Sequence, residues 1–110
     1  MKLLIAGSRG ITDFDLSAHI PPETTVIISG GAKGVDTLAE KYADEHGYEK
    51  IIIKPDYNTY GRGAPLRRNE EMVELADMVL VIWDGQSRGT KYTANYAKKK
   101  NKQMIIVEVK

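Results

Sequence analysis

The sequence predicts a single α/β domain spanning residues 1–110, built on one doubly wound parallel sheet of about five strands with helices on both faces. Three observations lead to this fold class. Five short apolar runs recur along the chain, stretches with helical periodicity separate them, and glycines mark the junctions where strands end. The five runs are residues 2–6, 25–29, 50–54, 78–83 and 103–109.

The apolar runs show little alternation of polar and apolar residues. A strand in an antiparallel sheet usually has one face in water, whereas a strand in a parallel sheet is covered on both faces and is apolar throughout. We therefore expect all five runs to be parallel strands with both faces covered.

The helix with the strongest pattern spans residues 33–46. Its apolar positions, including Val35, Leu38, Ala39 and Tyr42, follow the spacing of one helical face, and Gly47 provides a typical stop. A second helix is predicted from Pro65 to Ala76.

In the helix from Pro65 to Ala76, the proline stands where a missing N–H costs nothing. Leu66, Met72 and Val73 are expected to face the sheet. Further helices are predicted over residues 88–101 and, more briefly, over 13–20, where Thr12 and Asp15 have the spacing of a capping pair. Strands and helices thus alternate, and the expected strand order is 3-2-1-4-5 with right-handed crossovers.

Composition narrows the possible classes of protein. The 110 residues contain no cysteine, which excludes disulfides, thiol nucleophiles and zinc–thiolate sites. The first apolar run is too short for a signal peptide or a membrane span, so we expect a cytoplasmic protein without a membrane partner. The net charge is +1, although residues 86–110 hold seven Lys or Arg against one acidic residue. We interpret this basic segment as a solvated helix end.

Unusual residues concentrate where the first, second and fourth strands end. In the order 3-2-1-4-5 the topology reverses between the first and fourth strands, and ligands of open α/β sheets bind in the crevice at such a point. Glycines there let backbone N–H groups approach a phosphate at a helix N-terminus. The three loops contribute Gly7, Ser8 and Arg9, then Ser29, Gly30, Gly31, Ala32, Gly34 and Asp36, and finally Asp84, Ser87, Arg88, Gly89 and Thr90.

Basic residues in the same region favour an anionic ligand, because arginine binds phosphate in a bidentate manner. They are Arg9, Lys33, Arg62, Arg67, Arg68, Arg88 and Lys91. Helical spacing points Arg68 toward the crevice above Met72. The usual glycine motifs of dinucleotide-binding proteins and of NTPases are absent.

Aromatic residues and histidines add little to this prediction. Tyr57 and Tyr60 lie in the polar loop 56–63, a candidate lid, and either they or Trp83 can stack on a base; Trp83 also fits a core position. His19 and His46 lie on separate helices, so we expect no metal site and no resident cofactor. Magnesium accompanying a phosphate ligand remains compatible with the sequence.

Four ordered motifs resemble the SLOG superfamily, which groups DprA/Smf proteins, LOG phosphoribohydrolases and small YspA/YpsA-like proteins. The motifs are Gly7-Ser8-Arg9, the stretch from Ser29 to Asp36, Arg68-Asn69-Glu70-Glu71-Met72, and Ser87-Arg88-Gly89-Thr90. They look most similar to the small stand-alone members with the DUF2493 domain. The resemblance implies a Rossmann-like fold and a nucleotide-derived ligand.

The resemblance to the LOG enzymes assigns Arg68 to the position of their catalytic arginine. Their glutamate, three residues after the threonine that Thr90 matches, is replaced here by Thr93. Cleavage of an N-glycosidic bond normally uses a carboxylate, so Asp36 and Asp84 are the remaining candidates. Both also suit a ribose hydroxyl, a helix cap or a turn.

Three functions are therefore open at this point. The first is binding or sensing of a nucleotide-derived or other phosphate-bearing small molecule by residues of the three loops together with Arg68 and Asn69. The second is a phosphoribohydrolase-like hydrolase with Arg68, Asp36 and Asp84 as catalytic residues. The third is a DprA-like accessory that binds single-stranded DNA, for which the near-neutral charge is unfavourable. An edge strand or a helix face also offers a surface for homo-oligomers.

Overall fold

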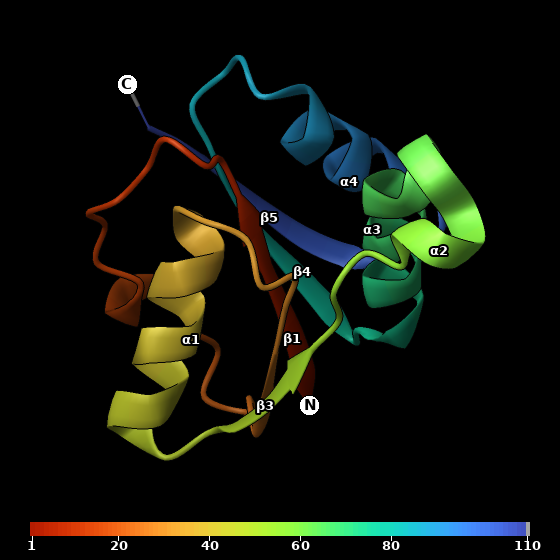
Figure 1. Ribbon diagram of the computed structural model, residues 1–110. Coiled ribbons are helices and arrows are strands. Elements are labelled where there is room, and N and C mark those ends of the chain that lie inside the picture. The colour runs from red at the N-terminus through yellow and green to blue at the C-terminus, as the bar shows by residue number, and fades with distance from the viewer. Residues whose placement is uncertain (110) are drawn as a thin grey trace.

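The predicted sheet is confirmed in all five strands and in their order. The computed structural model describes residues 1–109, and its parallel sheet runs β3-β2-β1-β4-β5 (Figure 1). The strands are β1 (Lys2–Gly7), β2 (Val26–Ser29), β3 (Glu49–Ile52), β4 (Met78–Trp83) and β5 (Gln103–Glu108). Successive strands are added on one side of β1 up to β3 and then on its other side from β4. The topology of the sheet therefore reverses between β1 and β4, where Gly7 pairs with Ile82 near the strand ends.

Helices cover both faces of the sheet. Figure 1 shows α1 (Val35–His46) on one face and α3 (Ala64–Leu75) with α4 (Arg88–Lys99) on the other. Each layer has its own buried cluster: Leu3, Ile5 and Leu80 pack toward α1, and Leu4, Val79 and Val81 pack toward α3 and α4. Within residues 1–109, no helix has the length and apolar character needed to cross a membrane.

The predicted stop of α1 is confirmed, but the helix begins two residues later than expected. Gly47 adopts a left-handed conformation (φ 74°) and donates its N–H to the carbonyl of Ala43. At the other end, Gly34 has φ 75° and ψ −126°, which is incompatible with a helical turn. The helix can therefore begin only at Val35.

Helices α3 and α4 also lie close to their predicted ranges. Pro65 stands in the first turn of α3, as the sequence indicated. Helix α4 ends at Lys99, and Asn101 follows with φ 57°, a left-handed conformation that stops the helix. Lys102 then donates from Nζ to the carbonyl of Ala76 at 2.8 Å, which satisfies a backbone group just after α3.

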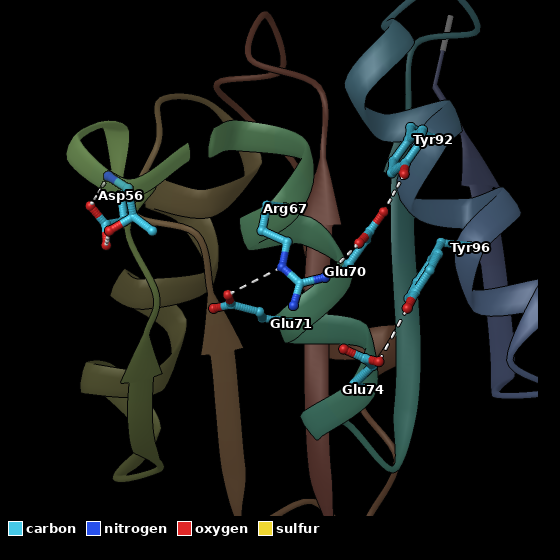
Figure 2. Close-up of polar contacts among 8 residues, drawn as sticks. Asp56, Arg67, Glu70, Glu71, Glu74, Tyr92 and Tyr96 are labelled. Atoms are coloured by element: carbon cyan, nitrogen blue, oxygen red, sulfur yellow. Dashed lines mark hydrogen bonds and ion pairs between the residues drawn. The ribbon is translucent and has the colours of Figure 1, made fainter. Parts of the chain in front are cut away.

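Paired side chains hold α3 against α4 (Figure 2). The Tyr92 hydroxyl donates to Glu70, and the Tyr96 hydroxyl donates to Glu74 at 3.1 Å. Arg67 donates from Nη1 to Glu70 at 3.3 Å on the same surface. These contacts fix the spacing of the two helices on which Arg68 and Thr93 stand.

Two local predictions were wrong. The predicted helix over residues 13–20 is only the single 3-10 turn Ser17–His19, and Thr12 does not cap it. Asp15 instead accepts hydrogen bonds from the N–H and the hydroxyl of Ser17, and such local side-chain bonds compete with helix formation. The loop 56–63 contains the short helix α2 (Tyr57–Tyr60), which Asp56 caps through the Thr59 N–H (Figure 2), and the 3-10 turn Gly61–Gly63.

The expectation that every strand is covered on both faces was also wrong for the two edge strands. All residues of β3 are exposed or only half-buried, and so are those of β5. Helix α1 packs on β1, β2 and β3, while α4 packs on β4 and β5. Each edge strand therefore has a helix on one face only, and an apolar run alone does not distinguish an edge strand from a central one.

Candidate functional site

A cleft of about 250 Å³ opens where the topology of the sheet reverses. It lies beyond the end of β1, between the loop after β2 and the first turns of α3 and α4. This is the location predicted for a ligand in an open α/β sheet. The lining residues are Ala6, Gly7, Arg9, Ala32, Asp36, Pro65, Leu66, Arg68, Asn69, Met72, Ser87, Gly89, Thr90 and Thr93.

The loop after β1 is held by the fully buried Ser8. Its carbonyl accepts the N–H groups of Ile11 and Val35, both at 3.3 Å, and its hydroxyl accepts the N–H of Asp84 at 3.0 Å. Ser8 thus joins the three loops predicted to form the site. It does not line the cleft, so its position indicates a structural role.

Arg68 is the most constrained side chain of the cleft. Only 7% of its surface is exposed, although it carries a charge. Its Nη1 donates to the carbonyl of Gly30 and, at 3.4 Å, to that of Ile53, while Nε donates to Oδ1 of Asn69 at 2.8 Å. Burial lowers the pKa of Arg68 below its ordinary value, and the charge of the nearby Asp36 opposes that shift. Nη2 has no hydrogen-bond partner among residues 1–109.

Gly30 allows Arg68 and Asp36 to approach each other. A β-carbon at Gly30 would lie 2.7 Å from Nη1 of Arg68 and 2.9 Å from Oδ2 of Asp36. Such distances are below normal contact, so any larger residue at this position would displace the pair. This glycine therefore makes space for the side chains of the site and does not itself line the cleft.

Asp36 is the one carboxylate among the lining residues, and only 8% of its surface is exposed. Oδ2 accepts the N–H of Ala32 at 3.1 Å. Burial raises the pKa of Asp36 above 3.8, while the Ala32 N–H and the charges of Arg68 and Arg9 act in the opposite direction. The site thus holds a carboxyl group whose ionised form is costly.

Replacing Asp36 by asparagine should reveal this cost as a pH dependence. Because the folded-state pKa is raised above the unfolded value of 3.8, the folded protein binds the proton more tightly than the unfolded chain. The stability that Asp36 contributes is complete below pH 3.8 and is lost as the pH rises through the folded pKa. We expect the free energy of unfolding of wild type, relative to Asp36→Asn, to decrease across this window in urea titrations.

Asp56→Asn provides the control of opposite sign. Hydrogen bonds from Thr59 lower the pKa of Asp56, so its contribution is present above pH 3.8 and is lost as the pH falls through the folded pKa. A slope of the same sign for both variants would contradict the assignment for Asp36.

The N-terminal turn of α4 forms another wall of the cleft. The Ser87 hydroxyl caps the helix by accepting the N–H of Thr90 at 3.4 Å and contacts the Thr90 hydroxyl at 3.0 Å. The N–H groups of Arg88 and Gly89 have no partner among residues 1–109, and a helix N-terminus carries partial positive charge. Gly89 lines the cleft, and no heavy atom lies within 4 Å of its missing β-carbon.

Several residues predicted from the loops lie outside the lining. Ser29 donates its hydroxyl to Glu40 at 3.2 Å, and Asp84 is exposed, with Oδ1 accepting the N–H groups of Gln86 and Ser87 at 2.8 Å. These hydrogen bonds lower the pKa of Asp84, as expected of a turn residue. The predicted residues outside the lining are Ser8, Ser29, Gly30, Gly31, Gly34, Asp84 and Arg88.

The cleft also contains residues that the loop motifs did not indicate. They are mainly apolar: Ala6, Pro65, Leu66, Met72 and Thr93. Leu66 was expected to face the sheet, but it is exposed and lines the cleft. Thr93 is buried and donates its hydroxyl to the Gly89 carbonyl at 3.0 Å. Helical periodicity from Thr90 was the signal for Thr93, since one turn separates the two.

The aromatic residues and the histidines lie outside the cleft lining. Trp83 packs against the core and donates from Nε1 to the Ser87 carbonyl at 3.0 Å, while Tyr57 and Tyr60 are exposed. His19 stacks on Phe14, and His46 stacks on Tyr42. Among residues 1–109, no three His, Cys, Asp or Glu side chains are grouped as metal ligands.

Comparison with known proteins gives the chain its family. Residues 1–60 match the family model described as the YspA, cpYpsA-related SLOG family, and these residues contain Arg9, Gly30 and Asp36. The Gene 61 protein of Mycobacterium phage D29 is 33% identical over 111 positions, covering 89% of each chain. No solved structure matches the chain significantly. The chain belongs to the YspA, cpYpsA-related SLOG family.

Proposed function

We propose that the cleft binds a nucleotide-derived small molecule through its phosphate, and that the protein acts as a binding or sensing module. The observation that carries this proposal is Arg68. A nearly buried arginine whose Nη2 remains accessible in an open cleft is an arrangement that an anion completes, because arginine forms strong, charge-assisted hydrogen bonds to phosphate and carboxylate.

The rest of the cleft supports the same ligand class. Arg9 is exposed and forms no ion pair among residues 1–109, and Gly89 in the first turn of α4 lines the same cleft. Asp36 is placed to accept a ribose hydroxyl. Leu66 and Met72 offer an apolar wall to a base. The volume lies just under the ~300 Å³ at which small-molecule pockets typically begin, which suits a mononucleotide better than a dinucleotide.

Calorimetric titration with matched ligands tests the proposal. We expect AMP and ribose 5-phosphate to bind, and adenosine, which lacks the phosphate, to bind at least ~10-fold more weakly, because a charged hydrogen bond contributes about 1.5–3 kcal/mol. Absence of binding by every phosphate-bearing ligand would overturn the proposal. A parallel titration with an oligodeoxynucleotide at low salt tests the single-stranded DNA alternative.

Arg9→Ala should weaken the binding of the phosphate-bearing ligands by about tenfold. Arg9 lines the cleft and forms no ion pair among residues 1–109, so its guanidinium is available to bind the phosphate. Arg62→Ala is the matched control, since Arg62 is also exposed but lies outside the lining. Equal loss in the two variants would show that the effect arises from net charge and not from the cleft.

A hydrolase is the second candidate, and Asp36 is the observation that favours it. A carboxyl group with a raised pKa beside an arginine can serve as a general acid near the base or the sugar. Thr93 supplies no carboxylate where LOG enzymes have glutamate. Chromatography of nucleoside monophosphates incubated with the protein distinguishes the two candidates. Release of free base by wild type but not by Asp36→Asn would show that the protein is a hydrolase. Recovery of intact nucleotide would exclude this activity and favour the binding module.

A further inference from the structure

Strand β5 forms one edge of the sheet. It pairs with β4 on one side and with no other strand among the described residues (Figure 1). Ile105 is 39% exposed and Ile106 is 48% exposed, and they point to opposite faces of the sheet. The segment Met104 to Val107 contains no charge, proline or glycine. An apolar edge of this length is normally protected, because its free backbone groups pair readily with another strand.

The direction of the free backbone groups follows from one hydrogen bond. Val109 donates its N–H to the carbonyl of Trp83 at 2.7 Å. Alternate residues of a strand in a parallel ladder bond to the same neighbour, so Ile105 and Val107 also face β4. The N–H and C=O groups of Met104, Ile106 and Glu108 therefore point outward from the sheet.

The opposite edge of the sheet is protected in the usual way. Strand β3 has only four residues and includes the charged Glu49 and Lys50, and Pro55 follows soon after it. Lys50 forms an ion pair with Asp44 at 2.8 Å. Charges and short length discourage pairing at an edge. The protein thus protects β3 and leaves β5 open, which distinguishes β5 as an interaction surface.

We propose that β5 pairs antiparallel with β5 of a second copy of this chain, around a two-fold axis at Ile106, so that the two sheets become one continuous sheet. In this register Ile106 lies opposite Ile106 of the second copy, Ile105 lies opposite Val107, and Met104 lies opposite Glu108. Every outward backbone group of the strand then gains a partner. A two-fold contact also closes on itself, which prevents chain-like assembly.

The backbone favours this register. A register centred on Ile105 instead would require the N–H of Lys102, which already donates to the Ala97 carbonyl at 2.9 Å. At the centre of the pairing Ile106 meets Ile106 and Ile105 meets Val107, so the apolar middle of the strand is complementary to itself.

Sedimentation equilibrium of matched lysine variants tests the pairing. We expect wild type to have twice the 12.3 kDa chain mass at high concentration. Ile106→Lys should be monomeric, with at least a ~100-fold weaker dimer, because two like charges would meet across the axis. Ile52→Lys, on the exposed edge β3, should remain dimeric. A monomeric wild type at every concentration, or equal loss in both variants, would overturn the proposal.

Disulfide formation tests the register without depending on variant stability. The chain has no cysteine, so a single introduced cysteine can bond only to another molecule. In Ile106→Cys the two Cα atoms would be about 5.5 Å apart, within the range for a disulfide. In Ile105→Cys they would be diagonal, about 7–8 Å apart and beyond it. Mild oxidation should give a covalent dimer of Ile106→Cys but not of Ile105→Cys. Efficient dimerisation of Ile105→Cys, or no dimer of Ile106→Cys, would refute the register.

Discussion

Gly34→Ala is expected to lower the free energy of unfolding by about 3–5 kcal/mol, a large part of the ~5–15 kcal/mol that stabilises a domain. Two costs add at this position. The backbone at φ 75° and ψ −126° is available essentially to glycine alone. A β-carbon would also lie 2.4 Å from the carbonyl oxygens of Ser8 and of Arg9, and these backbone atoms cannot move without breaking the loop after β1.

Gly47→Ala is the comparison in which both costs are small. Gly47 has φ 74° and ψ 23°, a left-handed conformation that other residues can adopt, and no heavy atom lies within 4 Å of its missing β-carbon. We expect this variant to lose only about 1 kcal/mol, the cost of a left-handed conformation. Urea unfolding monitored by circular dichroism measures both variants. Equal losses would mean that neither the backbone conformation of Gly34 nor its contact with the loop after β1 adds to the cost.

Consecutive strands and helices were predictable because their signals are local. Apolar runs, the periodicity of α1 and the stop at Gly47 each depend on a few neighbouring residues. The strand order followed from the alternation of strand and helix through the handedness of crossovers. The exposure of Ile52 and Ile106 was not predictable in this way, because a run of apolar residues is the same at an edge and in the centre of a sheet.

Part of the site was predictable because parallel strands carry their loops to one end of the sheet. Arg9, Asp36 and Arg68 do line one cleft. The loop motifs did not reveal which polar groups the protein itself uses. The Ser8 hydroxyl accepts the N–H of Asp84 from a distant part of the chain, whereas the Asp84 carboxylate accepts N–H groups of its own loop. A glycine-rich motif therefore contains residues that shape the cleft as well as residues that face it.

Arg68→Met should cost both stability and ligand binding. The substitution removes the donors to the Gly30 carbonyl and to Asn69, and it leaves Asp36 buried without the positive charge that opposes its desolvation. Each buried acceptor left without its donor costs about 1–3 kcal/mol of unfolding free energy, and the loss of the nearby positive charge adds to this cost. We also expect the affinity for a phosphate-bearing ligand to fall by ~100-fold or more, since truncating a buried charged donor costs about 2–5 kcal/mol of binding.

The double variant Asp36→Asn with Arg68→Met separates these two effects. Neutralising both groups also removes the buried carboxylate, so the part of the stability loss in Arg68→Met that comes from the charge of Asp36 should return. Phosphate binding should not return, because no donor replaces Nη2. Thermal unfolding and calorimetric titration of the three variants measure the two quantities independently. If binding recovered along with stability, Arg68 would act only by supporting the fold; if neither recovered, Asp36 and Arg68 would not be coupled through charge.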